Sequence, residues 1–237
     1  YFMVLIYGQK VANSVIMEKS SKLMDTFLTS VKPVSMIFGK VFAVVCSSIL
    51  QFAVWVAGLL LGLFAGSRFA GMGEAGSASG ALQFLAGDGC FRELFSLPGL
   101  LLAVLILVSG FLLYCALASI GGSAAGKPED LSSTNVLFTT ILVVSFLVSL
   151  AAGGVGLGSE EAAASWVYWI PFTSVLTLPG RLMLGEVSPA LGAGALAVSV
   201  AATVIFLYLA AKIYKMMALY KGNPPTPAKL FRMLRDR

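Results

Sequence analysis

Residues Gly121 to Lys127 (GGSAAGK) match the glycine and lysine spacing of a phosphate-binding loop. In such a loop the backbone amides and the lysine hold nucleotide phosphates, and a Ser or Thr directly after the lysine binds magnesium. Here Pro128 follows the lysine, so the magnesium-binding hydroxyl is missing. A bilayer-length apolar run precedes the motif, where a nucleotide-binding fold has a short strand. We therefore expect no ATP site at this segment.

Other catalytic chemistry has few residues to draw on. The chain contains no histidine, which removes histidine bases, histidine metal ligands and histidine-activated nucleophiles. Cys46, Cys90 and Cys115 lack the spacing of a zinc site or a disulfide framework. No predicted span carries a mid-membrane Asp, Glu, Lys or Arg, which disfavours an intramembrane enzyme and a proton-coupled carrier. We expect no catalytic, cofactor-binding or metal-binding residues in this chain.

The composition and the apolar runs of the chain are those of a membrane protein. Hydrophobic residues make up 58% of the chain and charged residues 11%, against roughly 25% charged in a soluble domain. The mean hydropathy is +0.92. Uncharged apolar runs of bilayer length recur along the chain, and each predicts a transmembrane helix. We predict an all-α, polytopic membrane protein with a single transmembrane domain over residues 1–237.

Hydropathy and turn residues divide the chain into segments. Residues 1–10 resemble the end of a truncated span, so we expect the chain to be a fragment or a processed product. Complete spans are predicted over residues 41–65, 98–120, 135–157 and 191–211. The other segments are an amphipathic helix over 14–32, an outer segment over 158–189 and a basic tail over 212–237.

Basic residues are unevenly distributed between the two sides of the predicted spans. Assigning alternate loops to alternate sides places Arg68, Arg92 and Arg181 on one side. The other side receives Lys10, Lys19, Lys22, Lys32, Lys40, Lys127, Lys212, Lys215, Lys221, Lys229, Arg232, Arg235 and Arg237. The positive-inside rule makes this second side the cytoplasmic face of the cell (inner) membrane. The positive charge then serves topology and contact with anionic lipid, and we expect no nucleic-acid partner.

Residues 14–32 combine an apolar and a charged face at helical spacing. The apolar face comprises Ile16, Leu23, Met24, Phe27, Leu28 and Val31, and the charged face comprises Glu18, Lys19, Lys22 and Asp25. Pro33 is expected to end this helix, because proline has no amide proton to donate. The helix is too short to span a bilayer, so we place it on the cytoplasmic surface. Passive lipid anchoring is the plain alternative to a role in binding a partner.

The segment Trp166 to Glu186 is too interrupted for a clean span and too apolar for a free loop. Its aromatic residues are typical of a membrane interface, and Pro171, Pro179 and Gly180 are expected to break any helix. A shallow re-entrant hairpin on the outer side fits best, because irregular backbone at membrane depth must be buried in protein. A plain interfacial loop is the alternative.

Small residues and one amide mark the span over residues 41–65. Gly58, Gly62 and Gly66 recur at four-residue spacing, which lets another helix approach closely. They predict a dimer interface or a moving helix contact, and ordinary packing within the chain is the alternative. Gln51 lies near the middle of the span, where an amide is costly unless paired. It either lines a transport pathway or makes an interhelical hydrogen bond.

The stretch from Glu18 to Lys40 resembles a segment of type-2 ABC transporter permeases, in the branch that includes sodium-efflux-type permeases. In that family an E-K-x-x-(K/R)-x-x-(E/D)-x-L-L-(T/S)-S pattern precedes a Gly-Lys pair at the start of the next span. The matching residues are Glu18, Lys19, Lys22, Asp25, Leu28, Thr29, Ser30, Gly39 and Lys40, with Phe27 where leucine is commoner. Residues 170–188 and 212–235 resemble the family's outer segment and its cytoplasmic ending.

The resemblance is to the C-terminal part of such a permease. It implies that the amphipathic helix docks on a separate ABC ATPase subunit, which binds the ATP and magnesium, and that permeases work in pairs. Carried over to this sequence, the ATPase-coupling surface comprises Glu18, Lys19, Ser21, Lys22, Asp25, Phe27 and Leu28. The implied function is the membrane subunit of an ATP-driven exporter, with sodium, drugs, peptides and lipids all open as substrates.

A non-transporting scaffold or membrane-assembly subunit is the alternative function. It would use the same surface helix to recruit a cytoplasmic partner. Partner-stimulated substrate flux separates the two hypotheses, because a scaffold would show none.

Overall fold

The computed structural model describes residues 1–20, 32–70, 97–151, 164–218 and 220, and these ranges are helical throughout apart from short turns. The helices are α1 (Phe2–Ser20), α3 (Pro33–Ala70), α6 (Leu97–Ala124), η1 (Pro128–Asp130), α7 (Leu131–Thr134), α8 (Val136–Ala151), η2 (Ser165–Tyr168), α9 (Pro171–Met183) and α10 (Pro189–Ala218). No strand occurs in the described ranges, and the prediction of an all-α protein is confirmed.

Three helices have the length and apolar composition needed to cross a membrane: α3, α6 and α10. The pair formed by residues 128–134 and α8 is bent by 43° and would give a fourth span if it crosses as one unit. The chain is therefore a multi-pass membrane protein, as its hydropathy predicts.

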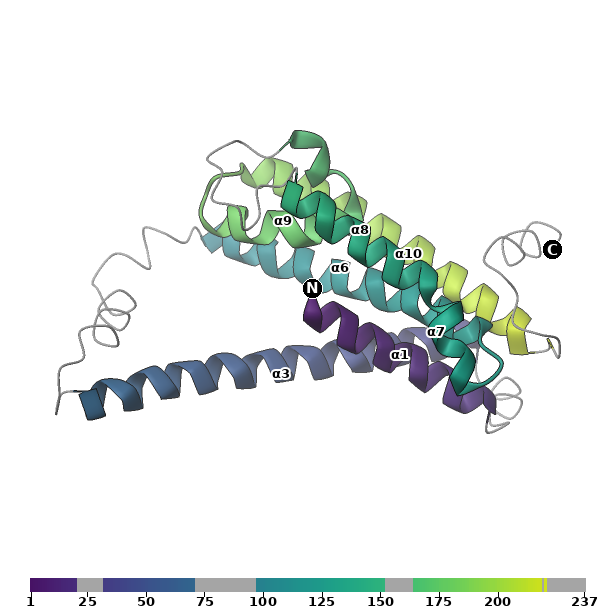
Figure 1. The fold of residues 1–237 in the computed structure, drawn as a ribbon. Coiled ribbons are helices and arrows are strands. Elements are labelled where there is room, and N and C mark those ends of the chain that lie inside the picture. Colours follow the sequence, from purple (N-terminus) through teal and green to yellow (C-terminus); the bar gives the residue numbers. More distant parts are fainter. Residues whose placement is uncertain (21–31, 71–96, 152–163, 219, 221–237) are drawn as a thin grey trace.

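Helix α6 lies at the centre of the structure and contacts α1, α3, α8, α9 and α10 (Figure 1). Its side chains Leu113, Tyr114 and Leu117 are buried among these neighbours. Hydroxyl groups join it to α10, since Ser109 Oγ lies 3.0 Å from Ser199 Oγ. Such interhelical hydrogen bonds hold helices together where lipid supplies no hydrophobic driving force between them.

Helix α1 runs without a break from Phe2 to Ser20, across the boundary expected between residues 1–10 and 14–32. Gly8 and Gln9 mark the expected boundary in the sequence, but within the helix both pack against other parts of the chain. Gly8 lies against the ring of Phe138, and Gln9 Oε1 accepts a hydrogen bond from Asn135 Nδ2 at 3.3 Å. Val15 and Ile16 are fully buried, so this part of the expected surface helix belongs to the core. Residues 21–31 of that helix lie outside the described residues.

Helix α3 begins at Pro33, eight residues before the predicted span. Pro33 therefore starts a helix, because the first helical position needs no amide proton. The ends of α6, α8 and α10 differ less from the predicted spans. α6 continues to Ala124, and α10 covers Pro189 to Ala218, so the first seven residues of the predicted tail are helical. α8 covers Val136 to Ala151, Asn135 lies in the turn before it, and residues 152–157 of the predicted span lie outside the described residues.

The outer segment contains a regular helix, α9, where the sequence suggested a broken chain. Pro171 occupies the start of α9, and Pro179 and Gly180 lie inside it. An internal proline is tolerated in membrane proteins when neighbouring groups satisfy the freed backbone. Pro179 is buried, and α9 packs on α6, α8 and α10. Whether α9 is re-entrant or interfacial stays a prediction.

The GGSAAGK motif forms the end of α6 and the turn that follows it. Residues Gly121 to Ala124 are helical, and a Cβ added at Gly122 would lie 2.4 Å from the carbonyl oxygen of Ala12. A Cβ at Gly121 would lie 2.4 Å from Asn135 Oδ1. These glycines thus let α1 and the start of α8 approach the backbone of α6, a packing role that accounts for their place in the sequence.

Candidate coupling site at the basic end

Five helix ends meet at one end of the bundle, which we call the basic end. α1, α6 and α10 end there at Ser20, Ala124 and Ala218, and α3 and α8 begin there (Figure 1). Lys19, Lys40 and Lys127 are among the lysines that this end carries. Residues 21–31 connect α1 to α3 in the sequence.

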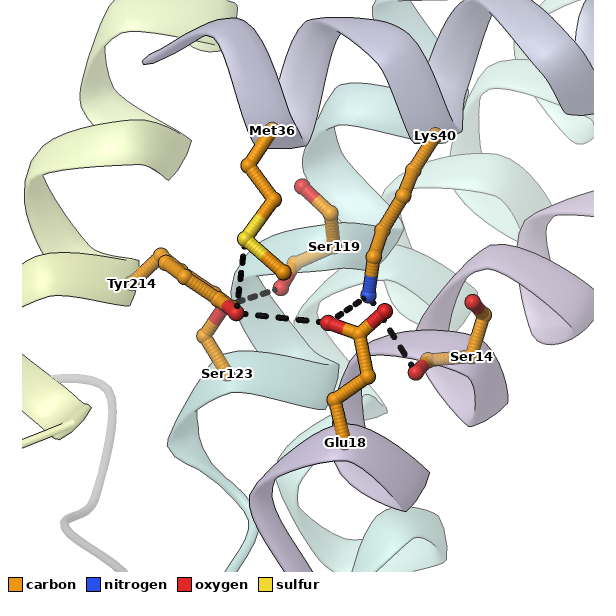
Figure 2. A network of polar contacts seen from close by, with 7 residues as sticks. All are labelled: Ser14, Glu18, Met36, Lys40, Ser119, Ser123 and Tyr214. Atoms are coloured by element: carbon orange, nitrogen blue, oxygen red, sulfur yellow. Dashed lines mark hydrogen bonds and ion pairs between the residues drawn. The ribbon is translucent and has the colours of Figure 1, made fainter. Parts of the chain in front are cut away.

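Glu18 and Lys40 form an ion pair between the last turn of α1 and the second turn of α3 (Figure 2). The side chains keep 22% and 14% of their surface exposed, respectively, so the pair is largely removed from water. Lys40 Nζ also donates to the carbonyl oxygen of Ser14 at 3.3 Å, which adds a second attachment to α1. A partly buried pair supported by a further hydrogen bond is worth more than an exposed one.

Tyr214 brings α10 into the same cluster (Figure 2). Its ring is fully buried, and its hydroxyl group donates to Glu18 Oε2 at 3.3 Å. The hydroxyl oxygen also lies 3.3 Å from Met36 Sδ on α3. One phenol therefore contacts both helices that flank residues 21–31.

Lys19 connects the end of α1 to the end of α6. Its Nζ donates to the carbonyl oxygen of Ser123 at 3.1 Å. The last carbonyl groups of a helix have no hydrogen-bond partner within the helix. A lysine near them can donate a hydrogen bond to one carbonyl group, and its positive charge interacts favourably with the helix dipole. Burial lowers the pKa of Lys19, and the negative charge of Asp130 offsets part of that shift.

The two coupling residues that the structure describes are turned toward other helices of this chain. Glu18 contacts α3 and α10, and Lys19 contacts α6, where the sequence placed both on a face toward a partner. Both side chains thus complete helix-to-helix contacts. Whether their remaining exposed surface faces a partner stays a prediction. The other predicted coupling residues lie outside the described residues: Ser21, Lys22, Asp25, Phe27 and Leu28.

Sequence reasoning missed Lys40, Tyr214 and Met36 as members of this cluster. In the sequence, Lys40 stands out only as part of a Gly-Lys pair and as positive charge that bears on topology. Its position inside a helix that starts at Pro33 could have signalled a need for an acidic partner. Tyr214 gave no local signal, because its contact with Glu18 joins residues 196 positions apart.

The small-residue stripe of α3 points away from the rest of the described chain. A Cβ added at Gly58, Gly62 or Gly66 would meet no described atom within 4 Å. Packing within the described chain therefore does not explain these glycines, and the dimer interface stays a prediction. Gln51 is partly buried, and its role in a pathway or a hydrogen bond also stays a prediction.

Comparison with known proteins gives a family match over most of the chain. Residues 1–212 match the model of the ABC-2 family transporter proteins. The chain belongs to the ABC-2 family. This confirms the resemblance to type-2 ABC permeases, and the match extends from α1 into α10.

A Bacillus subtilis (strain 168) protein of the curated set, "Uncharacterized protein YhaP", is 26% identical to this ABC-2 protein over 224 residues. The alignment covers 94% of this chain and 50% of YhaP. The chain thus spans about half the length of the curated relative that it matches. No solved structure matches it.

Proposed function

We propose that this chain is part of the membrane-spanning permease subunit of an ATP-binding-cassette exporter. In this proposal a separate ATPase subunit binds ATP and magnesium, and its hydrolysis cycle drives substrate efflux through the permease. The chain itself contributes no catalytic residue. The family match over residues 1–212 is the observation that carries the proposal.

The basic end supports the position of the ATPase in this proposal. By the positive-inside rule, the excess of Lys residues there supports assigning this end to the cytoplasmic face of the inner membrane. ATP is cytoplasmic, so the ATPase must dock on this face. Residues 21–31, between Ser20 and Pro33, are the proposed docking segment, since the helices on either side are anchored in the bundle.

A second permease copy or a homologue completes the proposed transporter. The stripe of Gly58, Gly62 and Gly66 on α3, where an added Cβ would meet no described atom within 4 Å, lets a helix of that second subunit approach closely. Membrane lipid covers the remaining apolar surface, which includes exposed side chains such as Phe52 and Leu61.

ATP hydrolysis by the assembled complex tests the proposal. The complete gene product that contains this chain is co-expressed with the ATPase encoded nearest to it, purified and placed in lipid nanodiscs. An exporter subunit should bind this ATPase and change its hydrolysis rate. ATP should also drive loss of labelled sodium, drugs, peptides or lipids from proteoliposomes. A complex made with a hydrolysis-deficient ATPase is the control.

Two results would contradict the proposal. Failure of the two proteins to associate would remove the coupling partner. Association with an unchanged hydrolysis rate and no ATP-dependent efflux would favour the scaffold hypothesis instead.

A further inference from the structure

We propose that Glu18, Lys40 and Tyr214 form a clamp that fixes α3 to α1 and α10, so that movement of residues 21–31 turns these helices together. We call these three residues the clamp. The inference rests on the proposed function, because it assigns the path by which an ATPase movement would reach the membrane. It concerns the contacts inside the permease and not the docking surface itself.

The first observation is that α3 is attached near its start and exposed further along. Ile37, Val41, Val45 and Ser48 are buried against the other helices. From residue 52 to residue 62 every side chain is exposed, on all sides of the helix. Figure 1 shows α3 diverging from the bundle over this part. α3 therefore extends as a lever of roughly 30 Å beyond its attached part, at 1.5 Å per residue.

The second observation is that α3 is held along two lines. Ile37 and Val41 form a buried apolar line, four residues apart. Met36 and Lys40 form a second line one residue earlier, which lies about 100° around the helix. Contact along one apolar line would let α3 roll, because apolar contacts are not directional. The polar contacts of Met36 and Lys40 on the second line oppose that rotation.

The third observation is the position of the clamp in the chain. Glu18 lies in the last turn of α1, before residues 21–31, and Lys40 lies in the second turn of α3, after them. Tyr214 lies on α10, which packs on both α3 and the central α6. The clamp thus joins the two helices that flank the proposed docking segment and attaches both to α10. Movement of that segment is transmitted to α3 and α10 as one body, since the ends cannot separate without breaking the ion pair.

The test measures the position of the far part of α3. Spin labels are attached at Leu61→Cys on α3 and Leu101→Cys on α6, two exposed positions. Cys46, Cys90 and Cys115 are changed to alanine in this background. Electron–electron distances are recorded for the complete permease with its ATPase in nanodiscs, with and without ATP.

Three variants are compared with the unaltered clamp. Glu18→Gln removes the ion pair, and the exchange E18K with K40E restores it in reverse. Glu186→Gln is the matched control, because it removes the contact with Arg181 Nη1 at 3.9 Å outside the basic end. Thermal unfolding of each variant shows that it is folded, and Tyr214→Phe provides a milder clamp variant if Glu18→Gln does not fold.

We expect a broader distance distribution and loss of the ATP-dependent shift for Glu18→Gln, recovery of both in the charge exchange and no change for Glu186→Gln. A Glu18→Gln or Tyr214→Phe protein that keeps the narrow distribution and the shift would overturn the clamp. The clamp would also be overturned if the permease changes the ATPase rate but ATP does not change the distance between the labels at residues 61 and 101. Failure of the ATPase to associate at all would refute the proposed function, whereas the nucleotide-free distributions would still decide whether the clamp exists.

Discussion

Replacement of Gly122 by alanine tests how closely α1 is seated on α6. The new Cβ would lie 2.4 Å from the carbonyl oxygen of Ala12 and 2.8 Å from its Cα. Unstrained contacts between such atoms are roughly 3.5 Å long, so α1 must move by about 1 Å. Because the opposing atoms belong to the backbone, no change of side-chain rotamer can relieve the overlap.

The expected cost follows from two opposing effects. Overpacking of this kind costs about 1–3 kcal/mol, and opposing backbone atoms place Gly122→Ala toward the upper part of that range. Alanine gains up to about 1 kcal/mol over glycine in helix propensity. We therefore expect the free energy of unfolding to fall by about 1–2 kcal/mol, the difference between the overpacking cost and the propensity gain.

Titration with sodium dodecyl sulfate in mixed micelles, followed by tryptophan fluorescence, measures this change. Gly39→Ala is the matched control, because a Cβ at Gly39 would meet no described atom within 4 Å. It should be as stable as the wild type or slightly more stable. If Gly122→Ala unfolds at the same detergent fraction as Gly39→Ala, the close contact between α1 and α6 is wrong.

Three further substitutions probe other contacts by the same titration. Glu18→Gln should lower the free energy of unfolding by roughly 1–3 kcal/mol, since it leaves Lys40 largely buried without its counter-charge; a loss below that of Glu186→Gln would contradict this. Ser199→Ala removes the 3.0 Å hydroxyl contact with α6 and should cost about 0.6 kcal/mol. A loss of stability several times larger would mean that Ser199 does more than join α10 to α6. Tyr114→Phe removes a 2.9 Å hydrogen bond to a carbonyl group of α9 and should cost about 1 kcal/mol, so unchanged stability would exclude that bond.

The spans could be predicted from the sequence because each long apolar run has one physical solution in a membrane. Runs such as residues 98–120 and 191–211 must form helices, and they appear within α6 and α10. Their ends were less well predicted. The extension of α10 to Ala218 includes charged residues, which hydropathy assigns to the tail although the helix continues through them.

The contacts at the basic end could not be predicted, because they depend on helices distant in the sequence. The alternation of charged and apolar residues in 14–32 predicts a surface helix with Glu18 and Lys19 on its charged face. Their partners within the chain are Lys40 and the Ser123 carbonyl group, and the hydropathy pattern contains no information on either. α9 was missed for a related reason, since Pro179 breaks an isolated helix but is accommodated in a packed one.

Cross-linking from residue 21 tests whether residues 21–31 dock on the ATPase. Ser21→Cys is placed in the complete permease, in a background without other cysteines, and cross-linked to the ATPase with and without ATP. Leu184→Cys is the control, because it is exposed and lies just beyond the end of α9, away from the basic end. Docking of this segment should give a nucleotide-sensitive cross-link from Ser21→Cys and none from Leu184→Cys. It is contradicted if Ser21→Cys reacts freely with water-soluble thiol reagents and captures no ATPase under any nucleotide condition.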